Sequence, residues 1–227
     1  MKKSDIDESL ATLYLRLNGY FTTGLIIHSS EHGKATTEVD CIAIRMPNHR
    51  QPDRIVSDAP FLRIKPGLTD LIICEVKSDP QSVTFNNSLK SNQQAIEAIL
   101  EWAGIHSREK IGNVAEKFQP LLNDQASFDQ AVSGISEDGV CLRGLLCCPT
   151  SAPIDGTRWL LDGTEILRYA EECFNPPEHR ETCSVRYNFQ QWGYPLRKIV
   201  TWLKDTKRRN PATINDLYRH LNVERQV

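Results

Sequence analysis

Residues 69–78 read T-D-L-I-I-C-E-V-K-S, a run that begins apolar and ends in charged residues. Its length and its isoleucine content predict a β-strand with a buried middle. Successive side chains of a strand point to opposite faces, so Glu75 and Lys77 lie on the same face. The stretch therefore predicts a core strand that carries a carboxylate and an ammonium group at its end.

A second strand is predicted at 36–45, T-T-E-V-D-C-I-A-I-R, in which Glu38 and Asp40 share a face. If this strand lies beside the strand at 69–78, two or three carboxylates and one ammonium group converge on one point. Carboxylate oxygens are ligands that Mg²⁺ and Mn²⁺ prefer. A metal ion there polarises a phosphoryl oxygen and lowers the pKa of a bound water, so the pattern indicates metal-assisted hydrolysis of a phosphate ester.

The sequence around these strands predicts an α/β fold. Apolar residues at helical spacing indicate a helix at 5–18, and an aromatic, β-branched run indicates a strand at 20–29. The other expected elements are a long irregular connection at 46–68, helices at 88–103 and within 108–122, a buried strand at 140–148, and helices at 163–174, 195–209 and 214–221. The order is α-β-β-β-α-(α)-β-α with a helical tail. The polar stretch 175–185 is the best boundary, which gives a domain at 1–174 and a C-terminal helical extension at 175–227.

Composition and charge narrow the class of protein. The chain has 27 Lys and Arg against 29 Asp and Glu, a net charge of −2, so a nucleic-acid partner must be met by a local basic patch or through metal ions. There is no run of about 18 apolar residues, and acids follow Lys2 and Lys3 where a signal peptide would be apolar. Seven cysteines, an odd number lying mostly in apolar runs, suit buried thiols. We expect a cytoplasmic protein with no membrane partner.

The strand pair and the order of elements resemble the PD-(D/E)XK, or restriction-endonuclease-like, nucleases, which carry D-x(n)-E-x-K on adjacent strands. The predicted helix at 5–18 carries Glu8 in the stretch E-S-L-A-T-L-Y-L-R-L-N-G-Y-F, and it is similar to the first helix of Mrr-type restriction enzymes and Holliday-junction resolvases. The resemblance covers residues 5–104 well and the strand at 140–148 loosely. It implies a restriction-endonuclease-like α-β-β-β-α-β core, with a mixed sheet flanked by helices.

The resemblance also implies roles for individual residues. Asp40 and Glu75 correspond to the catalytic metal ligands and Lys77 to the catalytic lysine. Glu8 and the main-chain carbonyl of Val76 correspond to further contacts of an Mg²⁺ or Mn²⁺ ion. Several branches carry a catalytic glutamine on the helix after the lysine strand. Gln93 is expected there rather than Gln94, because it is in line with the apolar face of the helix at 88–103 and should point toward the sheet.

Three other acids are weaker alternatives. Asp70 is closer to Glu75 in the sequence than Asp40 is, but strand alternation puts it on the opposite face. Asp58, in the connection 46–68, is a second rival for the position of Asp40. Glu38 shares a face with Asp40, but we interpret it as a flanking polar residue rather than a ligand.

The helix at 195–209 is amphipathic and basic. Its cationic residues suit contacts with a nucleic-acid backbone, although core tryptophans beside solvated charges give the same pattern. The candidate contacts are Lys204, Lys207, Arg208 and Arg209.

The sequence therefore favours a metal-dependent nuclease that hydrolyses phosphodiesters, with DNA the expected partner rather than RNA, in defence or repair. The alternative, from another class, is a catalytically silent protein of the same fold that binds or assembles within a multi-protein complex. A homodimer or a protein partner subunit fits either function. The intact pair of Glu75 and Lys77 favours the enzyme, whereas the near-neutral net charge favours the silent subunit.

Overall fold

The computed structural model describes residues 1–28, 35–52, 54–123, 128–152, 160–175, 193–205 and 211–223. The helices are α1 (Lys3–Leu17), α2 (Asn87–Ser91), α3 (Gln93–Ala103), α4 (Arg108–Phe118), α5 (Phe128–Ser133), α6 (Gly163–Phe174), α8 (Tyr194–Leu203) and α9 (Ile214–His220), with short 3-10 turns at Pro60–Leu62 and Gln119–Leu122. The strands are β1 (Phe21–His28), β2 (Ala35–Arg45), β3 (Thr69–Val76), β4 (Ile135–Glu137), β5 (Val140–Cys148) and β6 (Leu160–Asp162).

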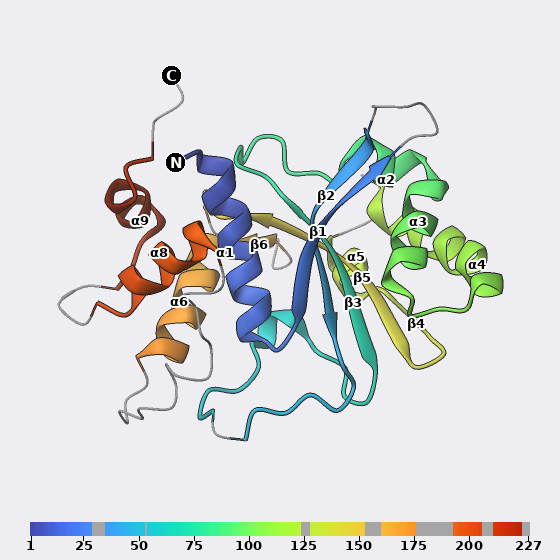
Figure 1. Cartoon of the computed structure of the whole chain (residues 1–227), viewed down its shortest axis with the longest axis horizontal. Helices are drawn as coiled ribbons and strands as arrows, with labels where there is room; N and C mark the ends of the chain where they lie inside the picture. Colours follow the sequence, from blue (N-terminus) through green and yellow to red (C-terminus); the bar gives the residue numbers. More distant parts are fainter. Residues whose placement is uncertain are drawn as a thin grey trace.

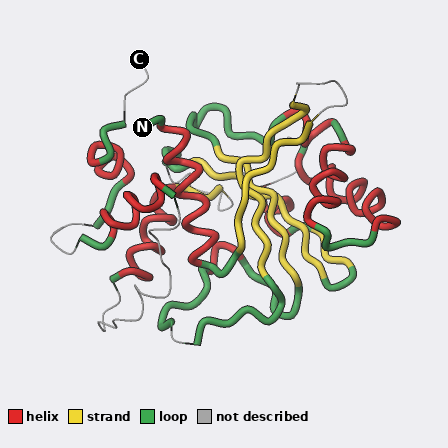
Figure 2. Tube along the Cα trace, viewed as in Figure 1, coloured by secondary structure: helices red, strands yellow, loops and turns green. Residues whose placement is uncertain are grey.

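The strands form one mixed six-stranded sheet, in the order β1-β2-β3-β5-β4, with β6 paired to β5. The first three strands are an antiparallel meander, and β5 then runs parallel to β3. Helices cover both faces of the sheet (Figures 1 and 2). The expectation of an α/β protein with a mixed sheet flanked by helices is confirmed.

Each face of the sheet has its own core. On one face, α1 packs with α6, α8 and α9; on the other lie α2, α3 and α4 (Figure 1). Apolar residues of α8 and α9, among them Ile199 and Leu217, are buried in the same cluster as Leu10 and Leu13 of α1. The described helices of the C-terminal extension therefore pack on the domain that precedes them.

The central strands agree closely with the sequence patterns. All nine residues of β5 are buried, and in β3 only the two terminal residues are partly exposed. A strand that pairs on both sides and is covered on both faces must be apolar along its length, which is why both runs were nearly continuous. The helix expected at 163–174 is also confirmed, and the Asp162 side chain caps it by accepting a hydrogen bond from the Glu165 amide at 2.9 Å.

Two expected helices have different bounds. The helix predicted at 88–103 is two helices, because the chain leaves helical geometry at Asn92 (φ −119°, ψ 98°), whose side chain caps α3 by accepting from the Gln94 amide at 3.1 Å. The helix predicted at 195–209 spans Tyr194–Leu203, and residues 206–210 lie outside the described part of the chain. The sequence patterns missed the short elements α5, β4 and β6.

Asp70, the nearest rival of Asp40, has a structural role. It is 2% exposed and forms a buried ion pair with Arg143 of β5, whose Nε donates to Asp70 Oδ1 at 2.9 Å. The hydroxyl of Tyr20 donates to Asp70 Oδ2 at 2.7 Å. Ile72 and Cys74, on the same face of β3 as Asp70, belong to the α1-side core, so Glu75 points to the other face, as expected.

No helix within the described ranges is long and apolar enough to cross a membrane.

Candidate functional site

The candidate site lies where the ladder between β2 and β3 ends. Paired residues run from Arg45 and Asp70 at one end to Cys41 and Cys74 at the other, so Asp40 and Glu75 are the next residues along the two strands. The carboxylate of Asp40 bridges this end, because its Oδ2 accepts a hydrogen bond from the Val76 amide at 2.7 Å. Asp40 is therefore fixed to β3 immediately beside Glu75.

A β-bulge in β2 helps to aim Asp40. Thr23 of β1 pairs with Ile42, whereas Leu25 pairs with Val39, so Asp40 and Cys41 together occupy the place of one residue opposite Gly24. Bulges break the alternation of side chains and bend a strand, and they are frequent next to active sites. Here the bulge lets Cys41 enter the α1-side core while Asp40 reaches across to the main chain of β3.

Glu75 and Lys77 form a pair at the end of β3. Glu75 is only 4% exposed, and its Oε1 accepts a hydrogen bond from Lys77 Nζ at 2.6 Å. The Lys77 amide donates to the Cys147 carbonyl at 2.8 Å, which extends the parallel pairing with β5 and holds Lys77 in register. Burial raises the pKa of Glu75 to about 7, with a further contribution from Asp40, although the bond from Lys77 opposes the shift.

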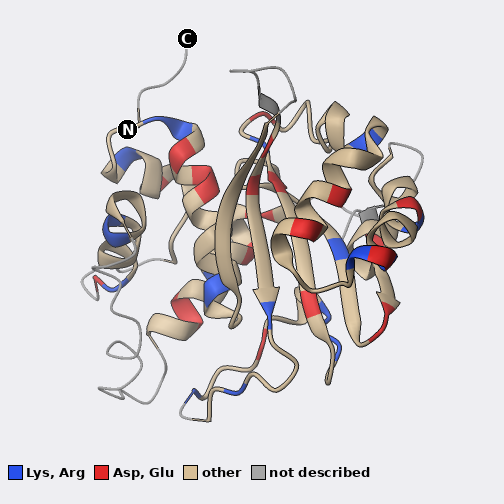
Figure 3. Ribbon diagram, turned by 45° about the vertical axis from the view of Figure 1, so that its right-hand side comes forward, with Lys and Arg blue, Asp and Glu red and all other residues tan. Residues whose placement is uncertain are grey.

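Glu8 of α1 approaches Asp40 from the opposite face of the sheet. The residue is exposed overall, but partial burial of its carboxyl group, followed by repulsion from Asp40, raises its pKa to about 7. Burial also raises the pKa of Asp40, and the charge of Glu38 adds to the effect. Figure 3 shows acidic residues on the strands and on the N-terminal helix beside them. The expected acids are thus near enough to repel one another.

Their convergence is only partial. Glu75 and Lys77 lie on the face that carries α2, whereas Glu8 approaches from the face that carries α1, and Asp40 joins the two at the Val76 amide. Within the described residues, no three His, Cys, Asp or Glu side chains are grouped closely enough to form a metal site by themselves. Mg²⁺ is commonly held by one or two carboxylates, with water and substrate phosphates as its other ligands. The donor chemistry of Asp40 and Glu75 fits that arrangement.

Asn86 is a site residue that the sequence analysis missed. Its side-chain Nδ2 donates to Thr37 Oγ1 at 2.8 Å and to the Glu38 carbonyl at 3.1 Å, and it is 3.4 Å from Glu75 Oε2. Its Oδ1 caps α2 by accepting from the Leu89 amide at 2.9 Å. One sequence signal could have identified Asn86 as the start of a helix: Asn is a typical N-cap residue, and the apolar Leu89 follows three positions later.

Gln93 does not reach the site. The expectation that it points toward the sheet is wrong, because its Nε2 donates to Glu97 Oε1 at 2.8 Å and to the Gly112 carbonyl of α4 at 3.2 Å. It is the first residue of α3, after the break at Asn92, and this break turns it toward the neighbouring helix. The amide group beside Glu75 is that of Asn86.

A second missed group fixes the segment after Lys77. Asp7 of α1 is fully buried, and its two carboxylate oxygens accept hydrogen bonds from the hydroxyls of Ser78 and Tyr218. Lys3 Nζ donates to the Ser78 carbonyl. Helices α1 and α9 therefore hold the residue that follows Lys77. No local pattern could show this, because Tyr218 is 211 positions from Asp7.

The basic candidates are only partly described. Lys204 lies at the end of α8 with its Nζ 5.6 Å from the centre of the Phe174 ring, so it packs on α6. Lys207, Arg208 and Arg209 lie outside the described residues. The other alternative to Asp40, Asp58, is paired with Arg45 at 2.8 Å and with Arg54 at 2.9 Å in the connection 46–68.

The raised pKa of Glu8 predicts how metal-free stability depends on pH. A carboxyl group whose pKa rises on folding, here from 4.5 to about 7, favours the folded state below pH 4.5 and loses that contribution as the pH rises to 7. Replacing Glu8 with Gln removes the loss. Because the residue is exposed, screening limits the effect to about 0.5–1 kcal/mol, so we expect a melting temperature about 1–4 °C above wild type at pH 8.

The measurement is thermal melting in chelator at pH 4.5 and pH 8. Glu109→Gln, at an exposed position in α4, is the matched control and should melt like wild type at both values. Equal melting of Glu8→Gln and wild type at pH 8 would show that Glu8 feels no repulsion from Asp40.

Comparison with models of protein families, with curated proteins and with solved structures finds no match for this chain.

Proposed function

We propose that the chain is a metal-dependent nuclease that hydrolyses phosphodiester bonds of nucleic acid, with DNA the favoured substrate. The observation that carries the proposal is the position of Asp40 and Glu75 side by side at the end of two paired strands, with the Lys77 ammonium on Glu75. Two carboxylates and one ammonium group at a single edge of a sheet suit a reaction in which a phosphate is attacked by water.

The topology supports the same proposal. A helix, three antiparallel strands, further helices and a strand parallel to β3 follow one another, in the sheet order β1-β2-β3-β5. This order resembles the one expected for a PD-(D/E)XK core, and Asp40 lies on β2 with Glu75 and Lys77 on and just after β3. Six cysteines of the described chain are buried and free, which fits action in a reducing cytoplasm.

The residues have distinct roles in this proposal. Asp40 and Glu75 would hold Mg²⁺ or Mn²⁺, with the Val76 carbonyl and Glu8 beside them, and the bound ion would supply Lewis-acid activation of water and phosphate. Lys77, held in register by its own amide, can exchange its bond to Glu75 for one to a phosphate oxygen. Asn86 fixes the distance between β2 and Glu75. Lys204, Lys207, Arg208 and Arg209 are proposed to contact the nucleic-acid backbone.

A specific observation favours a second function, that of a catalytically silent binding or assembly subunit. Glu75 is neutralised by Lys77, and Asp40 is hydrogen-bonded to the Val76 amide, so both carboxylates already have partners within the chain. In that function the pair is a structural ion pair at a strand end, and the protein acts as a homodimer or beside a partner subunit.

A cleavage panel distinguishes the two functions. Plasmid, linear, single-stranded and branched DNA and RNA are incubated with Mg²⁺, with Mn²⁺ or with chelator. The nuclease proposal expects cleavage of at least one substrate that requires the metal and is lost in Glu75→Gln but kept in Glu109→Gln. If every substrate stays intact in both metals, the silent subunit is the better account.

A further inference from the structure

The connection between β2 and β3 forms a cleft at the opposite end of these strands from the acids. The cleft has a volume of about 540 Å³ and is lined by residues from Arg45 to Gly67. Arg45 lies five positions after Asp40 along β2, which at about 3.3 Å per residue is roughly 16 Å. In Figure 1 this connection lies at the lower end of the sheet. The cleft is therefore separate from the candidate nuclease site.

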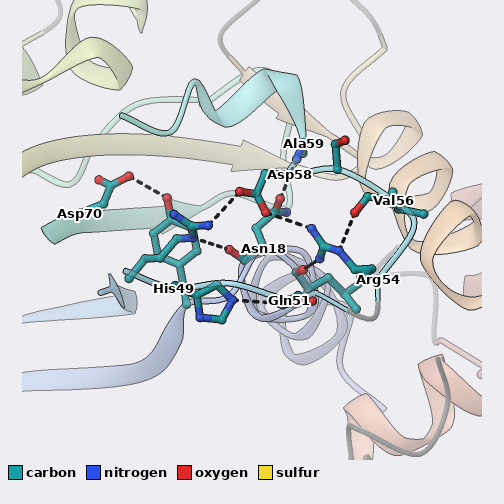
Figure 4. A network of polar contacts seen from close by, with 12 residues as sticks. Asn18, His49, Gln51, Arg54, Val56, Asp58, Ala59 and Asp70 are labelled. Atoms are coloured by element: carbon teal, nitrogen blue, oxygen red, sulfur yellow. Dashed lines mark hydrogen bonds and ion pairs between the residues drawn. The ribbon is translucent and has the colours of Figure 1, made fainter. Parts of the chain in front are cut away.

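The walls of the cleft are fixed to the end of α1. Arg45 Nε donates to the Asn18 carbonyl at 3.1 Å. Asn18 Oδ1 accepts from the Ala59 amide at 2.8 Å, and both of these residues are labelled in Figure 4. Arg54 donates to the carbonyls of Leu17 and Val56. The Leu17 and Asn18 carbonyls are acceptors that the end of α1 leaves without helical partners. The long connection is thus held in one shape, and a preformed cleft loses less entropy when a ligand binds.

The charge of the cleft is positive in a chain that is acidic overall. Arg45, Arg50 and Arg63 line it. Asp58, the one carboxylate among the described lining residues, is shared by the guanidinium groups of Arg45 and Arg54, and Arg63 is paired at the rim with Asp129 at 3.1 Å. Residues 45–68 contain five Lys and Arg against two Asp, whereas the whole chain has a net charge of −2. Such a surface attracts an anion, and guanidinium groups match phosphate oxygens in geometry.

Apart from Asn48 and His49, the remaining lining is apolar. Pro47, Pro60, Pro66 and Ile64 contribute to it, and proline rings present fixed, flat apolar surfaces. A ligand that used both parts of the cleft would combine a phosphate with a flat, largely apolar body. A bare anion would leave the proline surface unused.

We propose that this cleft binds a nucleotide, with the phosphate against Arg50 and Arg63 at the rim and the base against the prolines. The nucleotide comes from one of two sources, a free mononucleotide or the phosphorylated end of a nucleic-acid strand. The inference goes beyond the nuclease proposal and does not depend on it.

The test is calorimetric titration with adenosine, cytidine and guanosine 5′-monophosphates, a 5′-phosphorylated short DNA strand, inorganic phosphate and adenosine. The variants are Arg50→Ser and Arg63→Asn; Asn suits the left-handed backbone of Arg63, whose φ is 45°. Arg108→Ser, at an exposed position of α4, is the matched control. We expect each cleft variant to weaken nucleotide binding by at least about tenfold, and the control to bind like wild type.

The outcomes distinguish a free mononucleotide from a strand end, and failure of the cleft proposal from failure of the nuclease proposal. If mononucleotides bind, the ligand is a free nucleotide. If only the phosphorylated strand binds, the ligand is a strand end. Either result supports the cleft when Arg50→Ser weakens that binding. Binding should persist in Glu75→Gln, so failure of the nuclease proposal leaves it untouched. The proposal is overturned if no nucleotide probe binds at millimolar concentration, if phosphate or adenosine binds as tightly, or if Arg108→Ser weakens binding equally.

Discussion

Lys77→Ala is expected to reduce the rate of metal-dependent cleavage by at least about 100-fold, the scale for loss of one preorganised electrostatic partner. The ammonium group stabilises charge that grows on the phosphate in the transition state, so its loss acts on the chemical step. Substrate affinity should change little, because most of it comes from backbone contacts elsewhere. Single-turnover cleavage and equilibrium binding of the same substrate separate the two effects.

Melting of the same Lys77→Ala preparation measures how much the Lys77–Glu75 pair contributes to stability. The Glu75 side chain is 6% exposed, so losing Lys77 leaves a buried carboxyl group that can take up a proton, since its pKa is already about 7. We expect a loss of only about 1 kcal/mol in the free energy of unfolding. Lys117→Ala, which breaks an exposed pair with Glu137, is the control and should cleave like wild type. A variant that cleaves normally would exclude Lys77 from the reaction.

The largest expected effect on stability comes from Arg143. This side chain is 3% exposed and donates to Asp70 and to the Tyr20 hydroxyl, so Arg143→Met leaves the Asp70 carboxylate buried without its cation. Removing one partner of a buried ion pair typically costs about 3–5 kcal/mol, which corresponds to a fall in melting temperature of roughly 6–20 °C.

Three further variants, Arg108→Met, Asp70→Asn and the double variant, test the energetic role of this ion pair. Arg108→Met, at a side chain that is 93% exposed, should unfold within about 0.5 kcal/mol of wild type. The double variant Arg143→Met, Asp70→Asn should lose less than the two single variants together, because the pair acts as a unit. Urea unfolding measures wild type and the four variants. An Arg143→Met protein within about 1 kcal/mol of wild type would contradict the buried pair.

The sheet could be predicted because burial leaves a direct record in sequence. β5 and β3 are covered on both faces, so nearly every position had to be apolar, and in β2 the apolar run begins directly after Asp40. The break at Asn92 left no such record. Leu89 and Ile96, before and after it, belong to the same core, so their helical spacing continues across the change in backbone geometry. β4 and β6 have three residues each, too few to show a period.

Part of the candidate site could likewise be predicted from local spacing, and part depends on tertiary packing. Glu75 and Lys77 could be placed together because their spacing on one strand fixes a shared face. The bulge at Asp40 depends on pairing with β1, and the contact of Asp7 with Tyr218 depends on how α9 packs. Gln93 was misplaced because the rotation of α3 follows from the cap at Asn92 and not from apolar periodicity. Contacts set by tertiary packing leave no local pattern in the sequence.

Binding of Mn²⁺ tests the central claim most directly, because it requires no knowledge of the substrate. Calorimetric titration at pH 8 compares wild type with Asp40→Asn, which keeps an oxygen for the Val76 amide, and with Glu109→Gln as the control. The account predicts saturable binding near one ion per chain in wild type and in the control, with affinity at least about tenfold weaker in Asp40→Asn. Equal titrations of wild type and Asp40→Asn, or no binding at millimolar Mn²⁺, would contradict it.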